Sequence, residues 1–92
     1  MQTLCAFVMQ GCPHCRDVPS LASTVADLAP THLVDADDDL ASHLQIESYP
    51  TILLVNPLFT FAYSGPRTPE ALRAWVLRMM ALTSRFIKAV QT

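Results

Sequence analysis

The sequence predicts an α/β fold in which a four-stranded mixed sheet is flanked by helices and followed by a long C-terminal helix. Two observations lead to this prediction. Short apolar runs of strand length alternate with segments whose apolar residues recur at helical spacing. Proline or glycine stands close to most boundaries between them. The predicted order is β-α-β-α-β-β-α, and residues 1–92 are expected to form one domain.

The first predicted strand, residues 3–9, is apolar throughout, which is typical of a strand buried on both faces of a sheet. Gly11 permits a tight turn after it. A helix is then expected over about residues 13–28, where apolar side chains recur at spacings of three and four. Pro19 lies inside this range and is expected to bend the helix.

Three further strands and a short helix follow. The strands are predicted at residues 31–35, 52–55 and 58–63, the last two forming an antiparallel hairpin around an Asn-Pro turn. The short helix, over about residues 38–44, begins at a run of aspartates, which favour a helix N-terminus.

The last predicted helix opens at Thr68 and Pro69, as N-cap and first helical residue. Its apolar spacing continues for about 22 residues, or about 33 Å, which is longer than a small sheet usually needs. Phe86, Ile87 and Val90 therefore lie beyond the expected end of the fold. We expect them to fold back on the sheet in a monomer; self-association through them is the alternative.

Composition narrows the class of protein. The chain has 92 residues, 51% of them hydrophobic, and a net charge of -2, as in a globular protein. Its six Lys and Arg residues are scattered, so a nucleic-acid partner is not expected. No apolar run reaches the roughly 18 residues of a membrane span. Residues 1–9 do not read as a signal peptide, so a cytoplasmic location is expected.

The segment Gly11-Cys12-Pro13-His14-Cys15 carries the chemistry. A thiol becomes a nucleophile when it ionises, and the N-terminus of a helix stabilises the thiolate. Cys12 has that position, and Cys15, one helical turn on, can hydrogen-bond to it and later resolve a mixed disulfide. His14 adds a group that holds positive charge near neutral pH, and Pro13 stiffens the turn.

Other uses of cysteine remain open at this stage. A zinc site or a shared iron–sulfur cluster would need further ligands, and Cys5, His32 and His43 do not form a second pair with ligand spacing. An inert pair of buried cysteines is the third alternative. Cys5 itself is expected to be a small buried hydrophobe, with a regulatory thiol as the alternative.

The motif, the element order and Tyr49-Pro50-Thr51 together resemble the thioredoxin superfamily, over residues 2–82. Residues 1–16 resemble glutaredoxins, whose site is usually Cys-Pro-Tyr-Cys, and Cys-Pro-His-Cys is similar to bacterial periplasmic oxidants of the DsbA type. The second half, with Tyr63-Ser64-Gly65-Pro66-Arg67, resembles protein disulfide isomerase domains. The resemblance therefore implies a thioredoxin-like fold with the dithiol as its redox centre.

The resemblance also implies roles for three residues outside the motif. Pro50 is expected to be cis and to face the dithiol, and Tyr49 is expected to offer backbone groups to a substrate strand. Arg67 matches an arginine that tunes the pKa of the second cysteine in isomerase domains; a solvated loop arginine is the alternative.

Two departures from the family pattern matter. Thioredoxins and isomerases carry a buried acid six residues before the first cysteine, and that position here is Ala6. The proton of Cys15 must then pass to water or to His14. The Gly-Gly and acidic pair with which glutaredoxins hold glutathione is missing, which counts against glutathione binding.

The predicted function is a thiol–disulfide oxidoreductase that exchanges disulfides with protein substrates through Cys12 and Cys15, without a cofactor. Its partners would be protein dithiols or disulfides and a recycling reductase or oxidant. Two alternatives remain: a thioredoxin-like binding module with secondary redox activity, and a glutaredoxin-like, glutathione-dependent reductase. The direction of electron flow is open.

Overall fold

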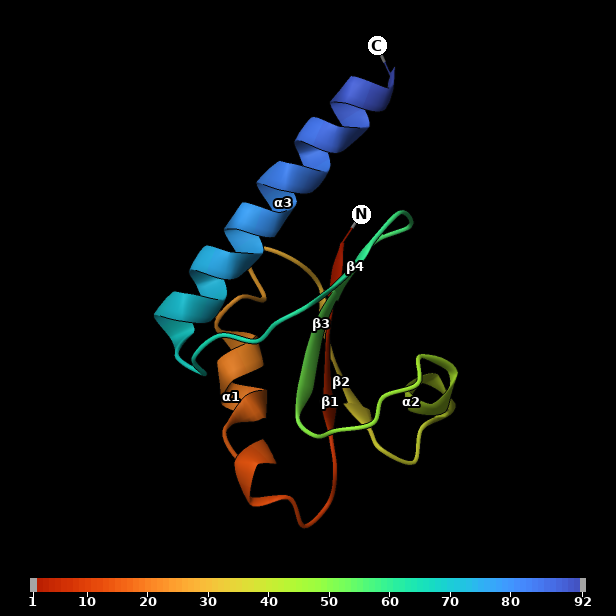
Figure 1. Cartoon of the computed structure of the whole chain (residues 1–92). Helices are drawn as coiled ribbons and strands as arrows, with labels where there is room; N and C mark the ends of the chain where they lie inside the picture. The colour runs from red at the N-terminus through yellow and green to blue at the C-terminus, as the bar shows by residue number, and fades with distance from the viewer. Residues whose placement is uncertain (1, 92) are drawn as a thin grey trace.

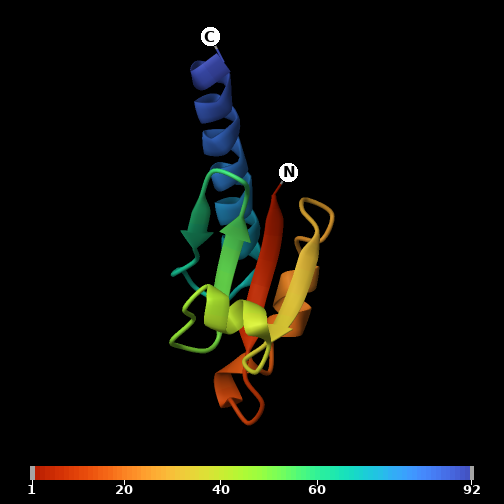
Figure 2. The same ribbon diagram turned by 90° about the vertical axis from the view of Figure 1, so that its right-hand side faces the viewer.

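The computed structural model describes residues 2–91 of the chain, and the side chains of residues 2–89. One mixed sheet has the strand order β2-β1-β3-β4 (Figure 2). The strands are β1 (Thr3–Val8), β2 (Thr31–Asp35), β3 (Thr51–Val55) and β4 (Thr60–Ala62). The helices are a 3-10 turn η1 (Pro13–Cys15), α1 (Val18–Ser23), α2 (Asp39–His43) and α3 (Pro69–Gln91). The predicted fold class is confirmed.

Strand β1 lies inside the sheet, where it pairs in parallel with β2 and antiparallel with β3. Its residues Leu4, Ala6 and Phe7 are fully buried. Successive side chains of a strand point to opposite faces, so an apolar run is buried along its length only when both faces are covered. β1 thus has the double burial that its composition predicts.

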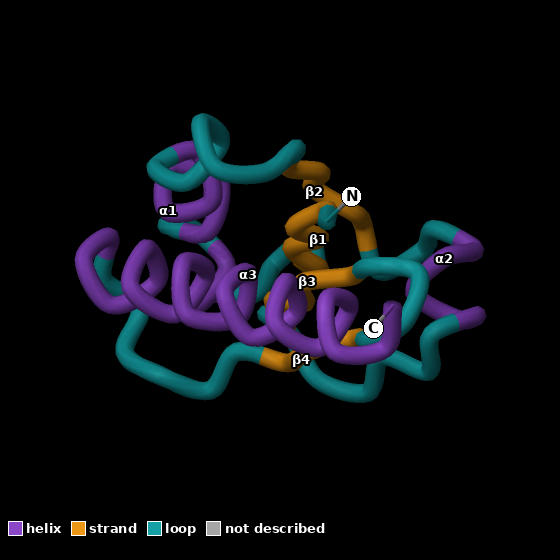
Figure 3. Tube along the Cα trace, turned by 90° about the horizontal axis from the view of Figure 1, so that it is seen from above, coloured by secondary structure: helices purple, strands orange, loops and turns teal. Residues whose placement is uncertain are grey.

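Helices cover the two faces unequally. Figures 1 and 3 place α1 and α3 on one face of the sheet and the short α2 on the other. The larger apolar cluster lies on the α1 and α3 side and includes Leu4, Ile52, Leu54, Leu72, Trp75 and Val76. The smaller cluster lies on the α2 side and is made of Cys5, Phe7, Val34, Ala41 and Leu53.

The expected continuous helix over residues 13–28 is wrong. The chain forms η1, a turn and then α1, and it continues in turns after Ser23. Pro19 stands in the first turn of α1, where its missing N–H is tolerated. In a longer helix the same proline would remove a hydrogen bond and clash with the preceding turn.

The hairpin is shorter than predicted on its return side. Asn56 folds the tip, because its side-chain oxygen accepts the backbone N–H groups of Leu58 and Phe59 at 2.9 and 2.8 Å. These two residues therefore belong to the turn, and the returning strand begins only at Thr60.

Helix α3 begins as predicted. The Thr68 hydroxyl accepts the N–H of Ala71 at 3.2 Å, and Pro69 is the first helical residue. The first half of the helix packs on the sheet, and the second half projects past the end of the sheet (Figure 1). Among the described residues, no helix is both long and apolar enough to span a bilayer.

Phe86 and Ile87, which were expected to fold back on the sheet, are only partly covered. The Phe86 ring meets the Phe59 ring of the hairpin edge-on, with centroids 4.8 Å apart, yet Phe86 and Ile87 remain 46% and 37% exposed. The side chain of Val90 lies outside the described ones. Self-association through this end of α3 stays a prediction.

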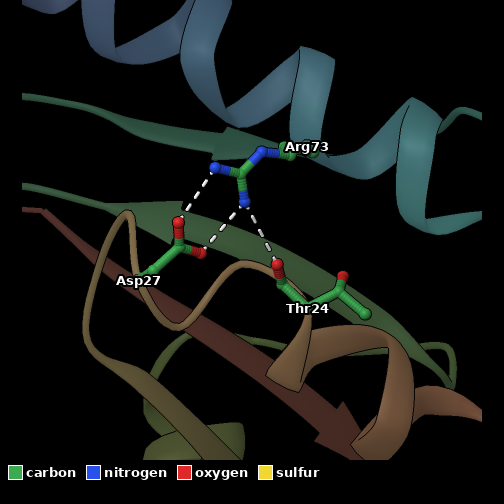
Figure 4. A network of polar contacts seen from close by, with 3 residues as sticks. All are labelled: Thr24, Asp27 and Arg73. Atoms are coloured by element: carbon green, nitrogen blue, oxygen red, sulfur yellow. Dashed lines mark hydrogen bonds and ion pairs between the residues drawn. The ribbon is translucent and has the colours of Figure 1, made fainter.

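A polar network ties α3 to the turns after α1 (Figure 4). The two guanidinium nitrogens of Arg73 donate to the two carboxylate oxygens of Asp27 at 3.0 and 2.9 Å, and one also donates to the Thr24 carbonyl at 3.3 Å. The hydrogen bond from Arg73 holds the pKa of the Asp27 carboxyl below its usual value. Such two-pronged contacts fix geometry as well as charge.

We expect Asp27→Asn to cause a small loss of stability that depends on pH. Because the pKa of Asp27 is lowered in the folded chain, the ion pair stabilises the fold above the usual aspartate pKa of about 3.9, and this contribution is lost as the pH falls through the lowered value. The difference in Tm between wild type and variant should be present at neutral pH and shrink as the pH falls below the usual aspartate pKa. Asp37→Asn, at an exposed aspartate of the α2 turn, is the control and should give no such profile.

Candidate active site

Cys12 stands where the chain turns from β1 into η1. Its backbone N–H donates to the Met9 carbonyl at 3.2 Å, and the turn passes through Gly11, whose φ of +81° other residues rarely adopt. Cys12 itself is extended, directly precedes η1 and is half-buried. Its thiol donates to the backbone carbonyl of Tyr49 at 3.7 Å. The sulfur is therefore held against the loop that precedes β3, in a residue that is less buried than Cys15.

Cys15 ends η1 and is buried, with 7% of its surface exposed. Its N–H donates to the Cys12 carbonyl at 3.2 Å. Burial raises the pKa of the Cys15 thiol, and a side-chain hydrogen bond with Cys12 and the charge of Cys12 raise it further. A hydrogen bond from the Met9 backbone and the charge of Arg67 lower that pKa in part. The two cysteines thus lie together as free thiols with unequal exposure.

The loop before β3 contributes a wall beside the dithiol. The Tyr49–Pro50 peptide bond is cis, which confirms that expectation. Tyr49 and Pro50 are both half-buried, and the Tyr49 carbonyl is occupied by the Cys12 thiol. The structure therefore brings the Tyr49 backbone to Cys12, and Pro50 is the next residue of the same loop.

Tyr63 holds the loop that carries Arg67, a role that the sequence did not reveal. Its hydroxyl donates to the Pro66 carbonyl, and its ring packs on Trp75 with centroids 5.0 Å apart. Gly65 lies against this ring, since a Cβ at that position would fall 2.8 Å from the Tyr63 hydroxyl oxygen. The spacing of tyrosine, glycine and proline just before the arginine was the available signal.

Three other residues were predicted to matter for the site or for cysteine chemistry: Pro13, His14 and Cys5. Pro13 and His14 are exposed in η1. Cys5 lies in the cluster under α2, where burial raises its pKa, as expected for a small buried hydrophobe. Among the residues that the structure describes, no three His, Cys, Asp or Glu side chains gather as ligands for a metal ion.

Comparison with known proteins agrees with the fold and the motif. A rice (Oryza sativa subsp. japonica) protein, "Protein disulfide isomerase-like 1-4", is 37% identical over 84 residues, covering 82% of this chain and 15% of that protein. The first thioredoxin domain of mouse protein disulfide-isomerase A4 matches with a TM-score of 0.67 and 31% identity, over 84% of this chain and 61% of that one. No protein-family model matches.

A third likeness is to the J-Trx1 fragment of ERdj5, with a TM-score of 0.73 and 26% identity, over 85% of this chain and 42% of that chain. The chain is thus a thioredoxin-like domain, as the sequence resemblance predicted. Within that class it is similar to thioredoxin domains of protein disulfide isomerase-like proteins. It spans only a minor part of the rice protein.

The expected cytoplasmic location is wrong. Proteins similar to this chain, such as ERdj5 and protein disulfide isomerase-like proteins, are found in the lumen of the endoplasmic reticulum. The expectation rested on residues 1–9, which do not read as a signal peptide.

We expect Arg67→Gln to raise the pKa of Cys15, because the charge of Arg67 lowers that pKa. The thiolate fraction of Cys15 at a fixed alkaline pH should fall, and its alkylation by iodoacetamide should slow measurably. Peptide-resolved mass spectrometry across a pH series measures this. Arg85→Gln on α3 is the matched control. An unchanged Cys15 profile in Arg67→Gln would contradict the assignment of Arg67.

Proposed function

We propose that this domain is a thiol–disulfide oxidoreductase that exchanges disulfides with protein substrates. The observation that carries the proposal is the pairing of a half-buried Cys12 with a buried, hydrogen-bonded Cys15 at the 3-10 turn η1 that follows β1. The names of its relatives support it, since the rice protein is called protein disulfide isomerase-like.

The proposed reduction proceeds in two exchanges. The Cys12 thiolate attacks one sulfur of a substrate disulfide; the other substrate sulfur leaves as a thiolate and takes up a proton. The Cys15 thiol then loses its proton and attacks the Cys12 sulfur of the mixed disulfide. The second substrate sulfur leaves and is protonated. The substrate gains two electrons and two protons, and Cys12 and Cys15 become a disulfide.

Substrate positioning falls to the loop before β3. The Tyr49 carbonyl lies at the Cys12 sulfur, so a substrate strand that reaches this sulfur passes along the backbone of Tyr49 and Pro50. Backbone groups bind a strand without selecting its sequence, which suits a protein acting on many disulfides.

The resolving step depends on the proton of Cys15. Among the described residues, none of the groups that shift the Cys15 pKa is a carboxylate, and Ala6 fills the position of the family's buried acid. The proton therefore passes to water or to the exposed His14. Since the Cys15 pKa is raised, deprotonation limits resolution near neutral pH.

The same exchanges run in reverse when a recycling oxidant keeps Cys12 and Cys15 as a disulfide. A recycling reductase would instead return the pair to the dithiol. Glutathione stays a further candidate for this second role. The redox potential of the Cys12–Cys15 pair decides whether the domain reduces substrate disulfides or oxidises substrate dithiols.

Cys12→Ser should abolish the reduction of insulin by dithiothreitol that the domain accelerates, because serine cannot form the mixed disulfide. Cys15→Ser should retain the first attack and accumulate mixed disulfide with insulin on non-reducing gels. Cys5→Ser is the control and should keep wild-type activity. A Cys12→Ser variant as active as wild type would refute the proposal.

The resolving step should accelerate with pH. Because burial raises the Cys15 pKa whether or not Cys12 is a thiolate, the single-turnover release of a thiol from the mixed disulfide should increase with pH, by up to about tenfold per pH unit, as far as the usual cysteine pKa of about 8.5. Stopped-flow measurement with a chromogenic disulfide follows this release. A rate that levels off below pH 7 would show that Cys15 is deprotonated by another route.

A further inference from the structure

A groove lies at the end of the sheet opposite the dithiol. Gln2 precedes β1 and Cys12 follows it, so the length of β1, about 20 Å, separates the two places. The groove has a volume of about 710 Å³ and runs between the projecting half of α3, the hairpin tip and the turn before β2. Its apolar walls include Leu28, Pro30, Leu58, Met80 and Ile87. This volume is in the range of sites that bind ligands.

The apolar face of α3 continues into this groove. Leu72, Val76 and Thr83 are buried on one side of the helix, and Ile87 follows Thr83 at a spacing of four. Ile87 is 37% exposed, and Leu58, which also lines the groove, is 56% exposed. An apolar surface of this kind is typical of a docking site.

Two polar groups in the groove walls lack partners. Among the described residues, Gln2 Oε1 and Asn56 Nδ2 are buried and make no hydrogen bond, and both residues line the groove. The Asn56 amide is fixed in its orientation, because Oδ1 accepts two N–H groups of the hairpin tip. One free acceptor and one free donor, each costly to leave buried, therefore belong to residues of a mainly apolar lining.

The unpaired Gln2 oxygen and Asn56 nitrogen indicate which kind of molecule could bind in the groove. The backbone of an extended polypeptide offers N–H donors for Gln2 and C=O acceptors for Asn56, and its side chains can fill the apolar groove. A second α3 helix has its backbone groups already paired, and an acyl chain has none. Because Gln2 Oε1 and Asn56 Nδ2 are covered, lining side chains must turn to admit the segment, as is common at binding surfaces.

The positive charge of α3 near the groove indicates the charge that a binding partner should carry. α3 carries four cations and one acid, Glu70, in a chain of net charge -2; Arg73 is paired with Asp27, and Arg85 and Lys88 lie in the half of the helix beside the groove. Lys88 neighbours the groove residue Ser84 at a spacing of four. Neither Lys88 nor Arg85 takes part in an ion pair within the described part of the chain. Two copies of this surface would repel each other, whereas an acidic segment would be attracted.

We propose that this groove binds an extended, apolar polypeptide segment of net negative charge, independently of the dithiol. The segment would place apolar side chains against Leu58 and Ile87, hydrogen-bond to Gln2 and Asn56, and direct its acids towards Lys88. The domain would then hold a protein partner at one end while Cys12 acts at the other.

Fluorescence anisotropy with labelled nonapeptides of alternating leucine and serine tests this. The peptides have blocked ends and no cysteine, and carry two flanking aspartates, two flanking lysines or neither. The aspartate form should bind saturably and most tightly, and rising salt should weaken it. No saturable binding, or equal binding of the aspartate and lysine forms, would overturn the proposal.

Variants locate the binding. Asn56→Asp keeps the oxygen that folds the hairpin but replaces the unpaired donor with an acceptor, and should weaken binding about tenfold. Ile87→Asp should do the same, while Leu77→Asp, an exposed leucine of the same helix outside the groove, should stay within about twofold of wild type. In the wild type, the Asn56 side-chain amide resonance should move on addition of peptide. Groove variants that bind like wild type would overturn the proposal.

Two other binding partners, a second copy of this chain and a membrane surface, would give different experimental results. Light scattering that shows a wild-type dimer dissociated by Ile87→Asp would assign the groove to a second copy. Co-sedimentation with phosphatidylserine vesicles that Ile87→Asp abolishes, without peptide binding, would assign it to a membrane surface. Either result overturns the peptide proposal, and neither bears on the chemistry of Cys12.

Discussion

The burial of β1 on both faces is the constraint on which the rest of this structure depends. The strand lies between β2 and β3, and α1, α2 and α3 cover its two sides. A fully buried strand cannot shift its register without exposing apolar side chains, so its end is fixed in space. The turn that follows β1 then leaves Cys12 half-buried and places Cys15 in the buried interior. A rigid strand thus positions a reactive loop.

Most of the fold and the sulfur pair could be predicted because they follow from local signals. The apolar runs predicted four strands, and the cysteine spacing predicted the pair. Two elements were misjudged where a local interaction competed with periodicity. Pro19 divided the expected first helix, since proline is tolerated only in a first turn. Asn56 drew Leu58 and Phe59 into the hairpin turn, although their apolar character favours a strand.

Features made by residues distant in sequence could not be predicted. Support of the Arg67 loop by Tyr63 and Trp75 depends on a packing contact between the hairpin and α3. The groove beside Ile87 depends on where α3 ends relative to the sheet, and no spacing in the sequence reveals this. The location was misjudged because it rested on the beginning of the sequence, whereas the relatives are found in the endoplasmic reticulum.

A redox titration of the three cysteines tests the central claim most directly. The domain is equilibrated with mixtures of reduced and oxidised dithiothreitol or glutathione, quenched in acid and mapped by mass spectrometry. The account predicts one two-electron transition that joins Cys12 to Cys15, with Cys5 reduced throughout because it is buried under α2. A disulfide that includes Cys5, or no disulfide between Cys12 and Cys15 under oxidising conditions, would contradict it.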